Sequence, residues 1–345
     1  MTSPGAQHTL KTRDYTLRTK RTNRPAYAAV DLGTNNCRLL VAEPSVKGFR
    51  VVDSFSRIVR LGEGVAATGR LSDEAIDRTI DALRICASKV RRASAIRVRN
   101  VATEACRQAE NCDRFMDRVQ NETGLDFEII TAAEEARLAL SGCVPLFDPA
   151  IAGSMVFDIG GGSTEVIWRP EHGKPIHVLS LPMGVVNLSE RYGGDRIDNA
   201  DYMRMVDETS GLLAGFEKDQ QILPQISAGQ VQMVGSSGTV TTLASVHLGL
   251  RKYVRSRVDG TTMRFDDLLR ISRMLADMTR QERAAITCIG PDRADLVVGG
   301  VAILEAIIRT WPVGRMRVAD RGLREGILLG LMAQDGHTVG ERVVH

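Results

Sequence analysis

The sequence predicts an α/β protein of two similar domains that face each other across a central cleft. The first observation is an internal repeat: residues 28–41 and 155–168 each combine an apolar strand ending in Asp, a Gly/Thr/Ser/Asn turn and a second apolar strand. The two aspartates, Asp31 and Asp158, are separated by roughly one domain length. Strand and helix patterns then follow in the same order in both halves. The length of 345 residues and the 43% hydrophobic content allow two hydrophobic cores.

The first half predicts a β-meander followed by alternating helices and strands. The hairpin at 28–41 leads into an alternating apolar segment at 49–55, and Ser72-Asp-Glu is typical of a helix N-terminus. Apolar residues then recur at helical spacing, at positions 76, 80, 83, 87 and 90. Further patterns predict a strand at 96–102, a helix at 113–121, a strand at 127–130 and a helix containing 134–140. This order of elements is that of the ribonuclease H-like module.

The second half repeats the order less closely. After the second hairpin we expect a strand at 176–181, a helix at 201–216, a strand from 232 that runs into a Gly/Ser turn and a helix, helices at 264–278 and 296–308, a strand at 315–319 and a short helix at 326–332. The chain is therefore divided into a flexible basic arm at 1–25, domain I at 26–145 and domain II at 146–320. The C-terminal helix, within 321–338, is expected to pack back on domain I.

Composition and charge argue against several classes of function. The net charge of +3 is too small to indicate a specific nucleic acid partner, and no apolar run reaches the roughly 18 residues needed to span a membrane. The N-terminus lacks the apolar core of a secretion signal, which favours a cytoplasmic location. The six cysteines form no CxxC pair and the six histidines are scattered. We therefore expect neither a disulfide framework, nor zinc chemistry, nor a histidine general base.

The repeated turns have the composition of phosphate-binding loops. Glycine lets the backbone approach an anion closely, and successive turn N–H groups with hydroxyl or amide side chains form a concave site for phosphate oxygens. The Asp at each strand end suits Mg²⁺, directly or through water, because this ion prefers a few carboxylates together with phosphate and water. The candidate phosphate contacts are Gly33, Thr34, Asn35 and Asn36 in the first turn and Gly160, Gly161, Gly162 and Ser163 in the second.

A third turn of this kind joins a strand to a helix at 235–239. Helix N-termini attract anions through free N–H groups and the helix dipole, so the turn adds Gly235, Ser236, Gly238 and Thr239 as candidates. A tight strand-to-helix connection explains the same residues equally well. The densest basic stretch in domain II, at 251–257, is a candidate path for a polyanion, with a solvated loop as the alternative.

Six motifs occur in order along the chain: Asp31–Thr34, Val101–Arg107, Glu134–Arg137, Asp158–Glu165, Gly235–Thr239 and Gly322–Gly326. Together they resemble the exopolyphosphatase and guanosine pentaphosphate phosphohydrolase (Ppx/GppA) family, over residues 26–335. The resemblance implies the actin-like superfamily fold, with two ribonuclease H-like domains around a deep cleft. It also implies the short, two-domain form of the family, without the C-terminal helical domain of longer relatives. Dimerisation is common in the family, so a homodimer is expected.

The resemblance implies a general base. Hydrolysis of a phosphoanhydride needs an activated water and charge neutralisation rather than a covalent nucleophile. The family's catalytic glutamate directly precedes Ala-Arg, which here is Glu135. Glu134 should then face solvent or pair locally, because successive helix residues point about 100° apart.

The resemblance also assigns the other charged residues. Asp31, Asp158 and Glu165 are expected to hold Mg²⁺ and its waters, and Arg107 to place its guanidinium on phosphate oxygens. Asn35 and Asn36 depart from the small hydroxyl residue that is usual in the family, but the backbone N–H donors remain.

The predicted function is an exopolyphosphatase that removes terminal phosphate from inorganic polyphosphate by Mg²⁺-assisted attack of a water activated by Glu135. A close alternative is removal of the 5′ terminal phosphate of guanosine pentaphosphate at the same site. A kinase or ATPase of the same superfamily is disfavoured by the motifs around Glu135 and Gly322. A non-catalytic binder of polyphosphate or alarmone is disfavoured by the intact Glu135 and by both repeated aspartates.

Overall fold

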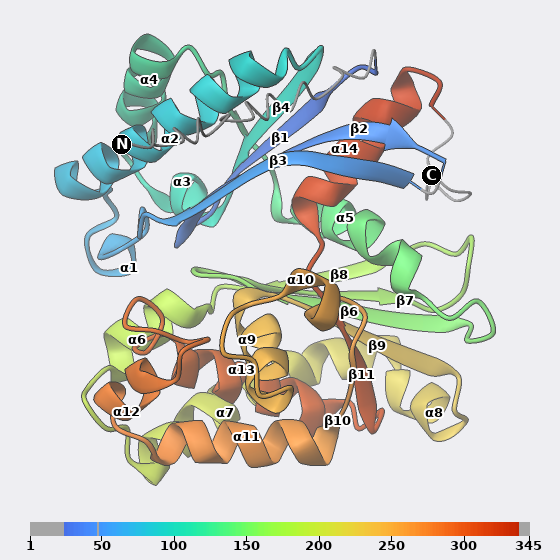
Figure 1. Cartoon of the computed structure of the whole chain (residues 1–345). Coiled ribbons are helices and arrows are strands. Elements are labelled where there is room, and N and C mark those ends of the chain that lie inside the picture. Colours follow the sequence, from blue (N-terminus) through green and yellow to red (C-terminus); the bar gives the residue numbers. More distant parts are fainter. Residues whose placement is uncertain (1–23, 47, 338–345) are drawn as a thin grey trace, which may run out of the picture.

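The first domain is built on a mixed five-stranded sheet. The computed structural model describes residues 24–46 and 48–337, so most of the predicted basic arm at 1–25 lies outside the described residues. The sheet has the order β3-β2-β1-β4-β5 (Figure 1). Its strands are β1 (Tyr27–Leu32), β2 (Asn36–Ser45), β3 (Gly48–Ile58), β4 (Arg97–Ala102) and β5 (Glu128–Ile129). Strands β1 to β3 are antiparallel neighbours and β4 is parallel to β1, which confirms the predicted meander and crossover.

Helices cover the outer face of this sheet. They are α1 (Val65–Thr68), α2 (Asp73–Ala93), α3 (Glu104–Gln108) and α4 (Cys112–Thr123). Helix α2 begins as predicted, because the Ser72 side chain accepts a hydrogen bond from the Ala75 N–H at 3.2 Å. Its apolar stripe, including Ile76, Ile80 and Leu83, is buried in one cluster with Val30 and Leu39 of the sheet. The short helices α1 and α3 were not predicted, since four or five residues show too little periodicity.

The second domain repeats this arrangement. Its sheet has the order β10-β11-β9-β6-β7-β8, in which β8, β7, β6, β9 and β11 correspond to β3, β2, β1, β4 and β5. The strands are β6 (Gly153–Ile159), β7 (Thr164–Arg169), β8 (His177–Leu181), β9 (Val231–Ser236), β10 (Thr262–Arg264) and β11 (Arg315–Ala319). The predicted α/β class with two ribonuclease H-like domains is therefore confirmed.

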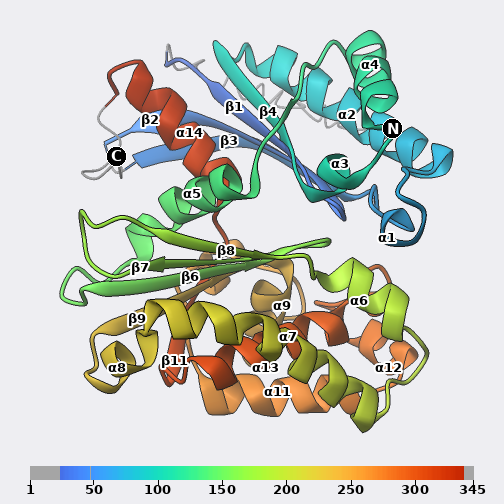
Figure 2. The same ribbon diagram turned by 180° about the vertical axis from the view of Figure 1, so that it is seen from behind.

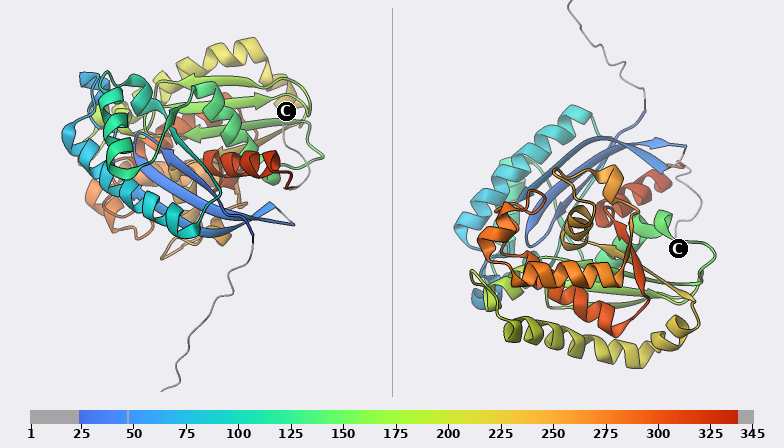
Figure 3. Two further views of the ribbon diagram at one scale, coloured as in Figure 1. Left: turned by 90° about the horizontal axis from the view of Figure 1, so that it is seen from above. Right: turned by 60° about the horizontal axis from the view of Figure 1, so that its bottom comes forward.

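The helices of the second domain lie mainly on the side of its sheet away from the first domain (Figures 1 and 3). They are α6 (Val185–Tyr192), α7 (Asn199–Gln220), α8 (Ile222–Ser227), α9 (Gly238–His247), α10 (Arg255–Val258), α11 (Phe265–Asp277), α12 (Arg280–Ala285) and α13 (Val297–Thr310). Helix α13 is buried on all sides from Val297 to Ile308, so it forms the centre of this core. No helix in the described part of the chain is long and apolar enough to cross a bilayer.

Two helices lie between the sheets, and each packs on the sheet built by the other half of the chain (Figures 1 and 2). Helix α5 (Ala132–Cys143) follows the first sheet, and its Ala136, Leu140 and Cys143 are buried against β6, β7 and β9 of the second. Helix α14 (Leu323–Gln334) follows the second sheet but packs on β1 and β2 of the first. The chain crosses between the sheets after α5, through the 3₁₀ turn Val144–Leu146. Each sheet thus depends on residues from both halves.

Glycines let α5 and α14 cross with their backbones in contact. A Cβ on Gly142 would lie 2.1 Å from the Gly322 carbonyl oxygen, and a Cβ on Gly326 would lie 2.0 Å from that of Leu138. These distances leave no room for a methyl group. Helix α14 begins at this crossing, where the Gly322 N–H donates to the buried Glu325 carboxylate at 2.9 Å. The motif Gly322–Gly326 therefore starts α14 and permits its close packing.

We expect Gly142→Ala to lower the free energy of unfolding by about 1–3 kcal/mol, because the methyl group overpacks the crossing. Gly211→Ala is the matched control: this glycine is exposed in α7 and an added Cβ meets nothing within 4 Å. The control should stabilise the protein by about 0.5–1 kcal/mol, since Ala favours the helix. Urea unfolding of both variants measures the difference. Equal stabilities would contradict the close crossing.

Candidate functional site

The two repeated turns touch each other between the domains. The first turn joins β1 to β2, and the second joins β6 to β7. A Cβ on Gly161 would lie 2.9 Å from the Thr34 Cβ and 3.0 Å from the Asn35 backbone nitrogen, while one on Gly162 would lie 2.8 Å from the Thr34 Oγ1. On the other side, a Cβ on Gly184 would lie 2.4 Å from the Gly161 carbonyl carbon and oxygen. Glycine is thus required in the second turn because backbone and side chains approach it from two directions.

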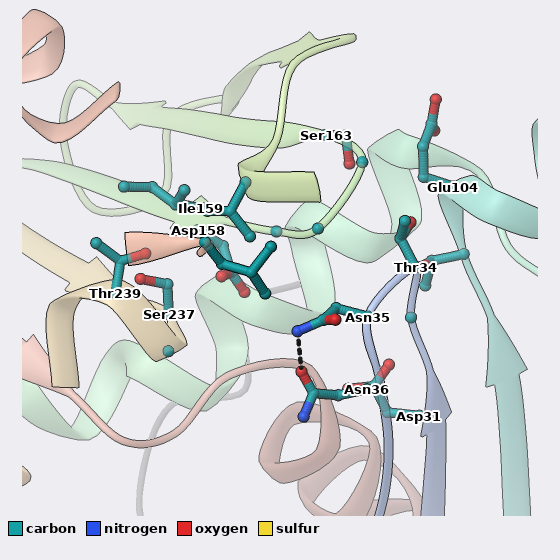
Figure 4. A pocket seen from close by; sticks show the side chains of 18 of the residues that line it. Asp31, Thr34, Asn35, Asn36, Glu104, Asp158, Ile159, Ser163, Ser237 and Thr239 are labelled. Carbon is teal, nitrogen blue, oxygen red and sulfur yellow. Dashed lines mark hydrogen bonds between the residues drawn. The ribbon is translucent and has the colours of Figure 1, made fainter. Parts of the chain in front are cut away.

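A cavity of about 130 Å³ lies between these turns (Figure 4). Its walls include strand ends from both sheets, the start of α5 and the N-terminus of α9. Fourteen of the seventeen residues assigned to the site from the sequence line it: Asp31, Gly33, Thr34, Asn35, Asn36, Glu135, Asp158, Gly160, Gly161, Gly162, Ser163, Glu165, Gly238 and Thr239. Both copies of the repeat seen in the sequence therefore line the same cavity.

The other three assigned residues do not line the cavity. A Cβ on Gly235 would lie 2.6 Å from the Phe157 ring, so this glycine serves the close packing of β9 against β6. The Ser236 hydroxyl donates to the Arg321 carbonyl oxygen at 3.1 Å. Within the third turn, it is the later residues that reach the cavity. Ser237, which belongs to the predicted turn but was not among its named contacts, lines the cavity and caps α9 by accepting a hydrogen bond from the Val240 N–H at 3.0 Å.

The third residue, Arg107, binds two carboxylates beside the cavity. Its Nη1 donates to Glu135 Oε2 at 2.9 Å and to the Ile130 carbonyl oxygen at 2.9 Å. Its Nε and Nη2 both donate to Glu104 Oε2, at 2.9 and 2.7 Å. The guanidinium predicted to lie on phosphate oxygens therefore fixes the Glu135 side chain in this structure. Glu104, which lines the cavity, was not singled out, although its spacing of three residues from Arg107 within α3 is that of a helical ion pair.

The two adjacent glutamates of α5 point in different directions. Thr131 caps the helix by accepting a hydrogen bond from the Glu134 N–H at 3.2 Å, and both glutamates belong to the first turn. Glu135 lines the cavity, whereas Glu134 accepts a hydrogen bond from Arg99 Nη2 at 2.6 Å outside it. This agrees with the rotation of about 100° between successive helix residues.

The carboxyl groups of the cavity are held in an environment that disfavours their charge. Burial raises the pKa of Glu135 to about 8. The Glu165 carboxylate raises this pKa further, and the Arg107 guanidinium lowers it. Burial likewise raises the pKa of Asp158 to about 7, where Arg38 opposes it and Glu135 and Asp31 add to it. The pKa values of Glu165, at about 7, and of Asp31 are also raised, first by burial.

This surplus of acidic groups fits a hard divalent cation. Among the described residues, no three acidic, histidine or cysteine side chains come close enough together to enclose a metal ion. One or two carboxylates that face an open cavity match Mg²⁺, which keeps several waters and takes substrate phosphate oxygens as ligands. Asp31, Asp158 and Glu165 all border the space where such an ion and its waters could bind.

Two arginines that were not predicted line the same cavity. Arg38 lies opposite Asp31 in the β1–β2 pairing, and Arg293 precedes α13. Neither has a carboxylate within ion-pair distance in residues 24–46 and 48–337. Burial and the neighbouring Arg38 lower the pKa of Arg293, which indicates crowded positive charge. The alternation of β2 could have identified Arg38, since residues 36 and 38 share a face, but no local pattern marks Arg293.

Comparison with known proteins agrees with this geometry. A model of the Ppx/GppA phosphatase family matches residues 40–335. Exopolyphosphatase 2 of Mycobacterium tuberculosis is 34% identical over 318 residues, covering 88% of this chain and 98% of that protein. Guanosine-5′-triphosphate,3′-diphosphate pyrophosphatase of Aeromonas salmonicida is 31% identical over 314 residues, covering 91% of this chain but 60% of that protein. A crystal structure of an exopolyphosphatase from Cytophaga hutchinsonii has a TM-score of 0.80 at 27% identity, covering 92% of this chain and 100% of that one.

We expect Asp158→Asn to stabilise the protein at pH 8 without divalent cations. A carboxyl group whose pKa is raised in the folded state destabilises the fold once the pH exceeds its unfolded pKa. The stabilisation gained by removing the Asp158 carboxyl group should therefore be present at pH 8 and vanish near pH 4. A rise in Tm of at least about 2 °C at pH 8 corresponds to roughly 1 kcal/mol. Asp148→Asn is the control. Its carboxylate accepts a hydrogen bond from the Ala150 N–H at 3.0 Å, and it does not line the cavity. A lower Tm for Asp158→Asn at pH 8 would contradict this account.

Proposed function

Because the chain belongs to the Ppx/GppA phosphatase family, we propose that it is an exopolyphosphatase that hydrolyses the terminal phosphate of inorganic polyphosphate. The observation that carries this proposal is the position of Glu135, fixed by Arg107 at 2.9 Å, in a cavity formed by two glycine-rich turns. The relative from Mycobacterium tuberculosis, an exopolyphosphatase by name, supports the choice of substrate.

In this proposal the two turns hold the terminal phosphoryl group from opposite sides. Backbone N–H groups of 34–36 and 161–163, with the hydroxyls of Thr34 and Ser163, serve as donors to its oxygens. The N–H groups of Gly33 and Gly160 close the turns instead, by donating to the Asn36 and Ser163 carbonyl oxygens at 2.9 Å. The N-terminus of α9 at Gly238 and Thr239 adds donors from a third direction. Phosphoryl transfer needs position and charge neutralisation more than covalent chemistry. Donors fixed by the fold meet that need because they are already oriented before the substrate enters.

Glu135 is the proposed general base. Its carboxylate accepts a proton from the attacking water, and its raised pKa of about 8 suits proton transfer near neutral pH. Arg107 is a positioning residue in this scheme, since its guanidinium bridges Glu135 and Glu104 instead of meeting the cavity. It holds the Glu135 oxygens in one orientation and limits the rise of that pKa.

Asp31, Asp158 and Glu165 are the proposed holders of Mg²⁺ and its waters. When bound, the cation supplies Lewis acidity and neutralises charge on the phosphate oxygens. Glu165 is oriented for this by a hydrogen bond from the Ser180 hydroxyl at 3.0 Å. Arg38 and Arg293 add positive charge beside α9. A Cβ on Gly238 would lie 4.0 Å from Arg38 Nη2, and Arg293 Nη1 donates to the Thr242 hydroxyl at 3.4 Å.

The second candidate is removal of the 5′ terminal phosphate of guanosine pentaphosphate. It needs the same cavity, and the relative from Aeromonas salmonicida is named for a reaction of this kind. This chain spans about three-fifths of that relative's length. An ATP-dependent kinase or ATPase and a non-catalytic binder have less support, because Glu135 faces the cavity and is fixed by an ion pair. A homodimer stays a prediction.

Phosphate release from matched substrates tests the proposal. Purified protein with Mg²⁺ should release phosphate from polyphosphate with a higher kcat/KM than from guanosine pentaphosphate, and release little from ATP. Excess EDTA should abolish the reaction and added Mg²⁺ should restore it, since the cation neutralises the phosphate charge. A clear preference for guanosine pentaphosphate would select the second candidate, while ATP as the only good substrate would overturn both.

Glu135→Gln should lower kcat for phosphate release on the order of 10²–10⁴-fold with little change in KM, as expected for loss of a general base. Glu134→Gln is the matched control, because the neighbouring carboxylate pairs with Arg99 outside the cavity. Its kcat should stay within about twofold, since surface ion pairs contribute little. If the control lost as much activity as Glu135→Gln, the assignment of the base would be wrong.

A further inference from the structure

A second hollow lies next to the cavity. It has a volume of about 730 Å³, and it shares Asn36 and Arg293 with the walls of the cavity. Its other walls come from the end of β3 and the segment after it in the first domain, and from residues 289–292 in the second. We call this hollow the exit groove. Asn36 and Arg293 therefore stand where the cavity and the exit groove adjoin.

The exit groove carries more positive than negative charge. Four arginines line it against two acidic residues, Glu63 and Asp292. Arg60 is engaged by Asp295 at 2.8 Å, and Arg78 by Glu63 at 3.0 Å. The two arginines without a carboxylate within ion-pair distance, among the described residues, are Arg57 and Arg293. The Arg57 guanidinium lies over the Phe55 ring, 5.4 Å from its centroid, and remains exposed to solvent.

The lining of the exit groove suits a chain of phosphates better than a nucleoside. Among the described residues no aromatic side chain lines it, so a purine base has no ring to stack on. A linear polyanion needs instead a continuous path with cations at intervals. Arg293 stands where the cavity meets the exit groove, and Arg57 stands at the edge strand β3.

We infer that the exit groove binds the distal phosphates of a polyphosphate chain whose terminal phosphate lies in the cavity, with Arg57 as a contact that only long chains reach. This inference rests on the proposed function and adds a path and a residue that determine chain-length preference. Arg60 has a different part: its ion pair with Asp295 and its hydrogen bond to the Asp292 carbonyl oxygen at 3.2 Å join the two domains beside the path.

The basic stretch at 251–257, which the sequence suggested as a polyanion path, is a competing route. Arg255 from this stretch is held by Glu325 at 2.8 Å and by Asp320 at 3.3 Å, so it secures the start of α14. Arg251 is exposed and lines neither the cavity nor the exit groove. Neutralising Arg251 therefore serves as the matched control for neutralising Arg57.

The test compares Arg57→Gln with Arg251→Gln on tripolyphosphate and on long-chain polyphosphate. Arg57→Gln should raise KM for the long chain about 3- to 10-fold, the effect of losing one charge-assisted contact. Its kcat, and both constants for tripolyphosphate, should stay within about twofold because Glu135 and the turns are untouched. The slope of log KM against log salt for the long chain should fall by about one. Arg57→Lys should recover most of the affinity, and Arg251→Gln should behave as the wild type.

Other outcomes separate the inference from the proposed function. If Arg251→Gln alone weakens the long chain, the path follows the 251–257 stretch and the inference is overturned, while the proposed function stands. Equal losses on short and long chains with Arg57→Gln would also overturn it, because they point to damage of the cavity. If the wild type releases no phosphate from either polyphosphate, the proposed function itself fails.

Discussion

The contact between the two glycine-rich turns is the constraint on which the rest of the site depends. Gly161 and Gly162 lie against Thr34 and Asn35 at distances that exclude a larger side chain. This contact brings the ends of β1 and β6 to one cavity, and with them Asp31 and Asp158. Burial there raises the pKa values of both carboxyl groups. Their ionised forms are therefore unfavourable in the empty cavity, where a cation and a phosphate are proposed to bind.

The exchange of α5 and α14 between the sheets links this cavity to the stability of the whole molecule. Glu135 enters the cavity from the first turn of α5, and the next residue, Ala136, is buried against the second sheet. Arg107 of the first domain then fixes the Glu135 carboxylate. The proposed base is thus held by contacts to both domains, and its position relative to the two turns should change whenever the domains move apart.

The sequence predicted the parts of the site that local patterns encode. The repeat of Asp before a glycine-rich turn marked both turns that line the cavity, because strand alternation and turn composition are short-range features. The helical offset indicated that only one of Glu134 and Glu135 could face the cavity, and the resemblance selected Glu135. What was missed depends on contacts between distant segments: the hydrogen bond from Arg107 to Glu135, and the entry of Arg293 into the cavity. No spacing within a single segment contains that information.

The fold was predicted for similar reasons, and its errors have similar causes. Long amphipathic helices such as α2 and the repeated hairpins were identified. Helix α6 was overlooked because it has only 8 residues and begins with two β-branched valines. Gly235 had two explanations in the sequence, and the ring of Phe157 behind it favours close packing. Gly142 gave no signal of its own, and Gly326 entered only as the end of the motif Gly322–Gly326; the crossing of α5 and α14 explains both.

A crystal structure of the Glu135→Gln variant with Mg²⁺ and tripolyphosphate tests the central claim most directly. The account predicts a terminal phosphate held between residues 33–36 and 160–163, a cation near Asp158 and Glu165, and a water between residue 135 and the phosphorus atom. The remaining phosphates should extend past Asn36 and Arg293. A ligand bound outside the cavity, or a terminal phosphate with residue 135 turned away from it, would contradict the account.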